Sequence, residues 1–285
     1  MSEGSATAAA VEAPPILELS DVWKHFGGIH AVAGATFSIS QGSITALIGP
    51  NGAGKTTLFN VVTGFYRADR GSIMYEGSSV FGKSPHAVAR LGMVRTFQIT
   101  KALAAMPVID NMMLAAPEQP GERLPLLVAR PMGWRRREAE VREQALELLS
   151  TFDLDGKADD YAGTLSGGQR KLLELARALM AQPRMVLLDE PMAGINPTLG
   201  RRLLEHMQDL RANQGVTFLF VEHDMDVVMN HSDEIVVMAQ GKVIVQGPPA
   251  EVRSDQRVID AYLGDTSANG ADRDGSAPGE EAGRP

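Results

Sequence analysis

The sequence has no cysteine among its 285 residues. This absence excludes disulfide bridges, thiolate metal sites and cysteine nucleophiles, and it is compatible with a reducing compartment. Long apolar runs are also missing, because no stretch approaches the roughly 20 residues needed to cross a bilayer. Residues 1–15 lack the basic and apolar regions of a secretion signal. We therefore predict a cytoplasmic protein.

An excess of positive charge is the third absence. Lysine and arginine total 27 against 35 aspartate and glutamate residues, which gives a net charge of −8. A protein that binds nucleic acid through a basic surface usually has the opposite balance. The composition therefore predicts no nucleic-acid partner.

The length predicts one large globular unit with a satellite subdomain. Residues 1–14 and 265–285 are small, polar and interrupted by proline or glycine, so they offer little to bury against the entropy of ordering. We expect both segments to be disordered tails. They flank a predicted domain over residues 15–264.

Two apolar patterns predict strands. Alternation over residues 16–26 and 31–40 favours antiparallel strands near the N-terminus. Short, nearly continuous apolar runs favour buried parallel strands, and they occupy residues 43–49, 185–189 and 216–222. Residues 234–247 have the pattern of a hairpin that turns at 240–242.

Helical spacing recurs between these strands, as βαβ crossovers require. The predicted helices cover residues 55–64, 138–152, 167–183 and 197–215. Between residues 99 and 165 the strand pattern fades and helices with proline-rich connections take over. We therefore predict an α/β fold with an N-terminal antiparallel β subdomain and an α-helical subdomain inserted at about 99–170.

The segment "GPNGAGKTT" matches G-x-x-x-x-G-K-[ST] between a predicted strand and a predicted helix. Its glycines let backbone N–H groups converge on a phosphate at the positive end of the helix. The lysine then meets the β and γ phosphates, and the first threonine offers a hydroxyl to Mg²⁺. A glycine-rich turn without function is the alternative interpretation. The predicted nucleotide contacts are Gly49, Pro50, Asn51, Gly52, Ala53, Gly54, Lys55, Thr56 and Thr57.

Two adjacent carboxylates, Asp189 and Glu190, end the apolar run "MVLLD". A phosphate site with a lysine still needs a second metal ligand and a group that orients the attacking water. We expect Asp189 to hold Mg²⁺, directly or through water, and Glu190 to polarise a water in line with the γ phosphate. Taken alone, "DEP" has a simpler interpretation as the start of a loop.

A second candidate anion site lies in "LSGGQ". Ser166 and Gln169 have the S-x-x-Q spacing of a helix capping box, and Leu172, Leu175, Ala176 and Leu179 form an apolar stripe on the helix that follows. The capping box does not explain the paired glycines, which lower helix propensity but allow close approach of a ligand. The candidate ligand contacts are Ser166, Gly167, Gly168 and Gln169.

"LSGGQ" together with "GPNGAGKTT" and "LLDEP" resembles the motifs of ATP-binding cassette (ABC) proteins over about residues 16–264. The resemblance implies a P-loop NTPase (RecA-like) core that binds ATP and Mg²⁺. It implies that two copies pack head to tail, and that the "LSGGQ" segment of one copy, the signature (residues 165–169), lies over the ATP of the other. It also implies that Phe26 stacks on adenine, that Gln98 reaches Mg²⁺ and the attacking water, and that His223 contacts the γ phosphate. The alternatives are that Phe26 packs as an ordinary aromatic residue, that Gln98 is a polar strand end and that His223 is a hydrogen-bonded loop histidine.

Finer features resemble the LivG-type ATPase subunits of bacterial branched-chain amino-acid importers. These features are "RTFQ", "AGINP", "VEHDM" and the closing "GKVIVQGPPAEVRSDQRVIDAYLG". The resemblance implies a peripheral ATPase at the cytoplasmic face of the inner membrane. Its partners are a second ATPase subunit (the same chain or a LivF-like paralogue), transmembrane permease subunits and, indirectly, a solute-binding protein. Import of urea, amides or other small organic solutes, or export of a lipopolysaccharide-type lipid, stays open, as does a nucleotide-dependent scaffold without turnover.

Two further features concern an arginine cluster and the turn after the carboxylates. Trp134 beside Arg135, Arg136 and Arg137 forms either a basic patch facing lipid or a membrane partner, or simply the charged start of an exposed helix. Asn196 occupies the position where many cassettes carry an aspartate that reaches across the dimer. This change removes a charge but keeps hydrogen-bonding capacity.

Overall fold

A computed structural model describes residues 15–96, 104–117 and 131–268. The predicted tail over residues 1–14 and most of the predicted tail over 265–285 lie outside these ranges. Gln98 lies outside them as well. Helix α11 (Gln256–Ala268) continues past residue 264, where the sequence predicted the domain to end.

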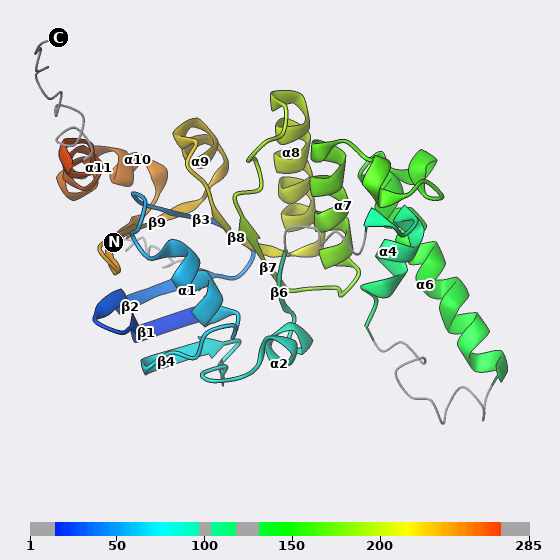
Figure 1. Cartoon of the computed structure of the whole chain (residues 1–285), viewed down its shortest axis with the longest axis horizontal. Coiled ribbons are helices and arrows are strands. Elements are labelled where there is room, and N and C mark those ends of the chain that lie inside the picture. Colours follow the sequence, from blue (N-terminus) through cyan, green and yellow to red (C-terminus); the bar gives the residue numbers. More distant parts are fainter. Residues whose placement is uncertain (1–14, 97–103, 118–130, 269–285) are drawn as a thin grey trace, which may run out of the picture.

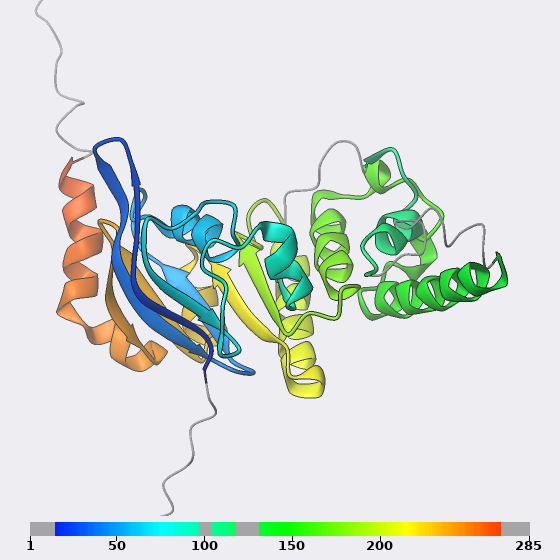
Figure 2. The same cartoon turned by 90° about the horizontal axis from the view of Figure 1, so that it is seen from below.

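An antiparallel sheet of four strands forms one layer (Figures 1 and 2). Its order is β2-β1-β4-β5, with β1 at Pro15–Phe26, β2 at Ile29–Ser40, β4 at Arg70–Tyr75 and β5 at Ser78–Ser79. Phe26 pairs with Ile29 where β1 turns into β2. The predicted N-terminal antiparallel strands are therefore confirmed.

The second sheet has the order β10-β9-β3-β8-β7-β6. All neighbouring pairs are parallel except β9 with β10. These two strands form the predicted hairpin, and its turn residues Gln240 and Gly241 have φ values of 49° and 79°, as a tight two-residue hairpin turn requires. The strands are β3 (Ile44–Ile48), β6 (Met93–Arg95), β7 (Met185–Asp189), β8 (Thr217–Val221), β9 (Glu234–Ala239) and β10 (Lys242–Gly247).

The central strands β3 and β8 are buried throughout and mostly apolar, because both faces of this sheet are covered. On β8, Phe218 and Phe220 face one hydrophobic core, whereas Leu219 and Val221 face the other. One core includes apolar residues from α7 (Gly167–Leu179), α8 (Pro197–Gln214), α9 (Met225–His231) and α10 (Pro249–Ser254). The other core is shared with β1, β2, α1 (Lys55–Val62) and α2 (Pro85–Arg90). This layering confirms the predicted α/β fold.

A helical part lies at the end of the molecule opposite α10 and α11 (Figure 1). It contains α4 (Val108–Leu114) and α6 (Pro131–Thr151), two 3-10 helices at Asp155–Lys157 and Ala162–Thr164, and the start of α7. Buried residues of α4 and α6, including Met112, Ala145 and Leu149, belong to the same core as α7 and α8. Packing therefore joins the helical part to the parallel sheet.

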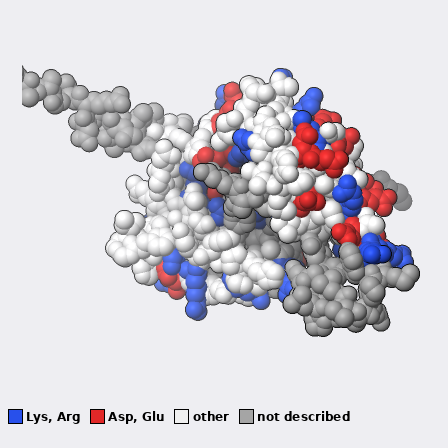
Figure 3. Space-filling model, turned by 45° about the vertical axis from the view of Figure 1, so that its right-hand side comes forward, with Lys and Arg blue, Asp and Glu red and all other residues white. Residues whose placement is uncertain are grey.

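Acidic and basic side chains are mixed on the face that carries this helical end (Figure 3). Arg136 pairs with Glu140 at 3.1 Å between Nε and Oε1, and a guanidinium nitrogen of Arg137 lies 3.8 Å from the other oxygen of Glu140. Such exposed pairs stabilise a helix only slightly. The intermixing agrees with the interpretation of Arg135, Arg136 and Arg137 as part of a charged, solvent-facing helix.

The carboxyl ends of the parallel strands gather the predicted motifs at one edge. Asp189 pairs in register with Val221, and Val221 pairs with Leu47 one residue before the end of β3. The loop after β3 and the first turn of α1 contain "GPNGAGKTT". The loop after β7 begins at Glu190, and Glu222 and His223 follow β8. Open α/β sheets bind ligands at this edge.

Candidate functional site at the carboxyl edge of the parallel sheet

The loop between β3 and α1 depends on glycine at two close backbone approaches. A Cβ atom on Gly49 (φ 149°) would lie 2.1 Å from the carbonyl oxygen of Met238. A Cβ atom on Gly54 (φ 100°) would lie 2.2 Å from the carbonyl oxygen of Ala31. Both obstacles are backbone atoms, which cannot rotate away. The loop therefore keeps its shape only with these two glycines.

Lys55 begins α1 and is 7% exposed. Its ammonium donates to the carbonyl oxygens of Gly49 at 2.7 Å and Pro50 at 3.0 Å, so the side chain folds back under the loop. Burial lowers the pKa of Lys55, and the charges of Glu190 and Asp189 partly oppose this shift. No described side chain caps the first turn of α1, so its N–H groups face the loop without a side-chain partner.

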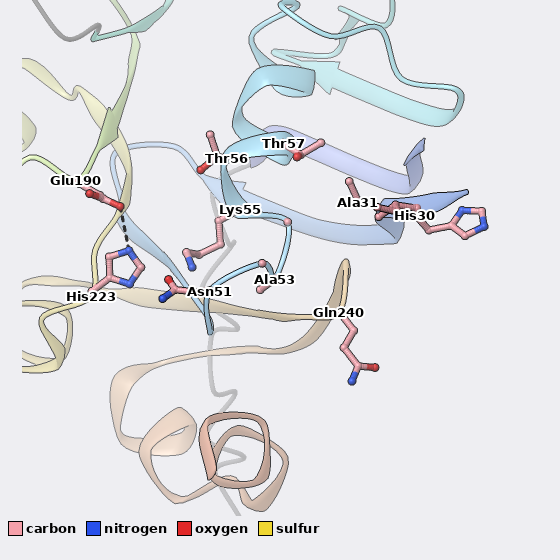
Figure 4. A pocket seen from close by; sticks show the side chains of 13 residues that line it. His30, Ala31, Asn51, Ala53, Lys55, Thr56, Thr57, Glu190, His223 and Gln240 are labelled. Atoms are coloured by element: carbon pink, nitrogen blue, oxygen red, sulfur yellow. Dashed lines mark hydrogen bonds and ion pairs between the residues drawn. The ribbon is translucent and has the colours of Figure 1, made fainter. Parts of the chain in front are cut away.

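An open cavity of about 480 Å³ lies over this loop (Figure 4). Lys55, Glu190 and His223 point into the same space, although they come from three different parts of the chain. Apart from Gly49 and Pro50, every residue of the predicted loop lines the cavity. The full lining is Ile29, His30, Ala31, Asn51, Gly52, Ala53, Gly54, Lys55, Thr56, Thr57, Glu190, His223 and Gln240.

The two adjacent carboxylates diverge. Oε1 of Glu190 lies 3.0 Å from Nε2 of His223, whereas Oδ2 of Asp189 lies 2.7 Å from a guanidinium nitrogen of Arg95. Glu190 has a φ of 48°, a left-handed conformation that is strained for a residue with a side chain. Its N–H donates to Val221 at 3.0 Å, and Lys171 donates to its carbonyl oxygen at 3.2 Å. These bonds hold the strained turn that separates the two carboxylates.

A second cavity, of about 280 Å³, adjoins the first. Thr56 and Glu190 line both cavities, whereas Asp189 lines only the second. Glu174 of α7 also lines the second cavity, and burial raises its pKa to about 7. The other lining residues are Arg95, Thr96, Lys171 and Ala193. The predicted metal ligands Thr56 and Asp189 are thus brought together.

Glu222 is a site residue that the sequence analysis missed. It is 5% exposed, and its two oxygens accept the N–H groups of Met192 at 2.7 Å and His223 at 3.2 Å. Burial raises its pKa, and the two backbone hydrogen bonds oppose this shift. Glu222 therefore joins the loop after Glu190 to the loop of His223. The sequence did contain a signal for Glu222, because this acid ends the apolar run "VTFLFVE".

Tyr262 of α11 also reaches the phosphate loop. The backbone of Gly49 hydrogen-bonds to its phenol oxygen, while burial raises the pKa of the phenol. No motif in the sequence pointed to this contact. It links the C-terminal helix to the loop that begins at Gly49.

The signature segment forms the predicted capping box. Ser166 Oγ accepts the N–H of Gln169 at 3.2 Å, and Gln169 Oε1 accepts the N–H of Ser166 at 3.0 Å. A Cβ atom on Gly168 would lie 2.5 Å from Cδ1 of Leu199 on α8, so close helix packing explains this glycine. A Cβ atom on Gly167 would meet only the carbonyl oxygen of Gly194, at 3.8 Å. None of Ser166, Gly167, Gly168 or Gln169 lines either of the two described cavities.

Neither Phe26 nor Asn196 lines these two cavities. Phe26 is 44% exposed and stands edge-on to Tyr66, with 5.3 Å between the ring centroids. Its stacking on adenine stays a prediction. Asn196 caps α8, because its Oδ1 accepts the N–H of Leu199 at 2.9 Å. The role of Gln98 falls outside the described residues and stays a prediction.

The family model of ABC transporters matches residues 32–193, and a model of branched-chain amino acid ATP-binding cassette transporters matches residues 242–268. The chain is 44% identical to a probable branched-chain amino acid transport ATP-binding protein LivG of Archaeoglobus fulgidus, over 87% of this chain and 95% of that protein. It is 40% identical to the high-affinity branched-chain amino acid transport ATP-binding protein BraF of Pseudomonas aeruginosa, over 88% of this chain and 98% of that protein.

A crystal structure of the ADP conformation of an ATP-binding cassette of an ABC transporter is also similar. It has a TM-score of 0.77 and 39% identity, and the match covers 88% of this chain and all of that one. The fold and the site define a P-loop ATPase. The chain belongs to the ABC transporter family of ATP-binding proteins, whose ATP hydrolysis is coupled to transport. Within the described ranges, no helix is both long and apolar enough to span a bilayer.

Proposed function

We propose that the chain is the ATP-hydrolysing subunit of an ABC importer of branched-chain amino acids. The names of its relatives and the match at residues 242–268 support this substrate class. One observation carries the assignment of the reaction. Glu190 and His223 touch at 3.0 Å and face the cavity above Lys55 and the phosphate loop. A carboxylate, an imidazole and a buried ammonium around one open cavity suit phosphoryl transfer to water.

The donor atoms suit Mg²⁺. Among the described residues there is no cluster of three or more acidic or histidine ligands. Magnesium typically binds through one or two protein oxygens together with phosphate oxygens and water. The Thr56 hydroxyl and the Asp189 carboxylate line one cavity and supply such oxygens. A cation already sits on Asp189, namely the guanidinium of Arg95. We propose that Thr56, Asp189 and Gln98 hold the metal, which neutralises phosphate charge when bound.

Lys55 is proposed to exchange its two carbonyl contacts for the β and γ phosphates, with the backbone N–H groups of residues 51–57 around them. Glu190 orients water and accepts its proton, and its strained backbone fixes the direction of the carboxylate. His223 and Lys55 stabilise the charge that develops on the γ phosphate. Phe26 stacks on adenine, and Gln98 relays the nucleotide state to the helical subdomain, about residues 99–170.

The position of the signature supports a two-subunit site. Ser166, Gly167, Gly168 and Gln169 do not line the cavity of the phosphate loop in their own chain. We propose that they close over ATP held by a second subunit, either this chain or a LivF-like paralogue. Closure moves the helical subdomains against transmembrane permease subunits at the cytoplasmic face of the membrane. A solute-binding protein acts through the permease.

Variant Glu190→Gln tests the reaction. It is expected to bind ATP, to lose hydrolysis by at least about a hundredfold and to accumulate as a closed dimer, because an amide cannot accept the proton from water. Nucleotide binding, phosphate release and size-exclusion chromatography are the readouts. Glu143→Gln, an exposed site on α6, is the matched control. Wild-type hydrolysis by Glu190→Gln contradicts the assignment. ATP binding without any turnover by the wild-type complex would instead identify a scaffold.

The substrate class needs the intact membrane complex. ATP hydrolysis is measured with solute-binding proteins loaded with leucine, isoleucine or valine, and with a urea- or amide-binding protein as comparison. The proposal is supported if ATP hydrolysis is stimulated only by the binding proteins loaded with leucine, isoleucine or valine. Stimulation only by urea or amides, or by a lipid in place of a loaded binding protein, assigns one of the alternative transport classes.

A further inference from the structure

Arg95 has an environment that the proposed reaction does not use. It is the last residue of β6, and its side chain is only 11% exposed. Its Nη2 donates to Asp189 Oδ2 at 2.7 Å, and its Nη1 donates to Asn60 Oδ1 of α1 at 2.6 Å. The guanidinium carbon also lies 5.7 Å from the centroid of the Phe59 ring. Arg95 therefore joins β6, β7 and the helix of the phosphate loop.

The contact to Asp189 is a partly buried ion pair at the carboxyl end of a sheet strand. Asp189 has 27% of its side chain exposed, so the carboxylate still faces the second cavity together with Thr56. The backbone fixes the relative positions, because β6 pairs with β7 and the N–H of Thr96 donates to Leu187 at 3.0 Å. A charge-assisted bond of this length between partly buried groups is strong.

We propose that Arg95 is the resident counterion of Asp189 and is displaced from it when Mg²⁺ binds with ATP. This inference rests on the proposed role of Asp189 as a metal ligand. Arg95 acts through Asp189 and is therefore a positioning residue. In the state without metal it neutralises Asp189 and keeps it beside Thr56.

The physical basis is competition between two cations for one carboxylate. A guanidinium and a divalent metal bound to the same carboxylate lie a few ångströms apart and repel each other. This repulsion is expected to weaken metal binding by more than tenfold. Metal binding must therefore weaken the contact between Arg95 and Asp189. Because β6 is the last described strand before the helical part, this exchange also makes that strand responsive to the metal.

The decisive measurement compares the dissociation constant of ATP in EDTA with that in excess free Mg²⁺. In Arg95→Met the tightening by Mg²⁺ is expected to grow by about tenfold or more. Without Arg95, the metal has no competitor at Asp189, and metal-free ATP meets an uncompensated carboxylate. Both effects raise the ratio of the ATP dissociation constant in EDTA to that in excess Mg²⁺. Arg95→Lys keeps a cation at this position and is expected to stay within about threefold of the wild type.

Arg184→Met is the matched control. Arg184 precedes the other end of β7, and its guanidinium pairs with Glu76 at 2.5 Å, away from both cavities. It is expected to leave the Mg²⁺ effect unchanged. An unchanged or smaller effect in Arg95→Met, with ATP still bound, overturns the inference but leaves the proposed function intact. Failure of the wild type to bind ATP with or without Mg²⁺ overturns both.

Hydrogen exchange on the wild type gives a second readout that needs no folded variant. With a non-hydrolysable ATP analogue, addition of Mg²⁺ is expected to speed exchange in the peptide that covers Met93–Arg95 and Thr96 by about threefold or more. Release of Arg95 removes a side-chain anchor of this three-residue strand. If hydrogen exchange in this peptide stays the same or slows when Mg²⁺ is added, the displacement of Arg95 from Asp189 by the metal is contradicted.

Discussion

Replacing Glu174 by glutamine is expected to stabilise the chain more at alkaline than at acidic pH. Glu174 lies on α7 and lines the second cavity, where burial raises its pKa from 4.5 to about 7. Lys171 and Arg177 on the same helix oppose this shift. Arg95, Asp189 and Glu190 are the charged side chains that line the cavity from other elements. Glutamine keeps the shape of the side chain without a charge to desolvate.

The sign follows from proton linkage. Because the pKa of Glu174 is higher in the folded than in the unfolded chain, the folded state holds the proton more tightly between pH 4.5 and about 7. This contribution to stability is fully present below pH 4.5 and is lost as the pH rises through about 7. At about 1.36 kcal/mol per unit of pKa, the loss amounts to about 3 kcal/mol. The advantage of glutamine over glutamate is therefore about 1 kcal/mol at pH 5 and about 3 kcal/mol at pH 8.5.

Urea denaturation of both proteins at pH 5, 7 and 8.5, without nucleotide, measures this difference. Taking the difference between variant and wild type cancels the titration of all other acids, provided that the mutation leaves them unchanged. Glu143→Gln on the exposed face of α6 is the control and is expected to give a difference that does not change with pH. A flat difference for Glu174→Gln, or one that falls as the pH rises, refutes the reasoning.

Three further predictions concern the loops of the site. Glu222→Gln is expected to lower the free energy of unfolding by about 1–3 kcal/mol and to slow ATP hydrolysis, because an amide oxygen replaces only one of the two oxygens that accept the N–H groups of Met192 and His223. Urea denaturation and phosphate release measure these two effects, and unchanged stability would contradict the prediction. Gly49→Ala is expected to cost several times the roughly 1 kcal/mol of Gly52→Ala, since the new Cβ meets a backbone carbonyl at Gly49 and open space at Gly52; equal unfolding midpoints would disprove the explanation. Ser166→Arg is expected to abolish hydrolysis while ATP binding to the same chain persists; loss of ATP binding in a folded variant would place the signature at its own nucleotide.

Much of the fold and several site residues could be predicted because their signals lie in short windows of sequence. The apolar runs at β3, β7 and β8 predicted buried parallel strands, and the structure confirms them. The capping box of Ser166 and Gln169 involves residues three apart and is also confirmed. The domain boundary predicted at residue 264 falls within helix α11, which extends to Ala268.

Contacts between distant segments were not predictable in the same way. Arg95 and Asp189 are 94 positions apart, and Glu222 and Met192 are 30 apart. These pairs meet only because parallel strands bring their carboxyl ends to one edge in a fixed register. Nothing near Arg95 in the sequence indicates that its guanidinium binds the predicted metal ligand.

The sequence by itself determined the chemistry available to this protein: a phosphate loop, two adjacent carboxylates and a capped glycine-rich helix start. Tertiary structure decided how those groups divide their work. The strained backbone at Glu190, held by Val221 and Lys171, turns its carboxylate towards His223 while Asp189 faces Arg95. The reason is physical. Local hydrogen bonds and apolar periodicity are encoded in neighbouring residues, whereas the direction of a side chain and its charged partners depend on the register of strands far apart in the chain.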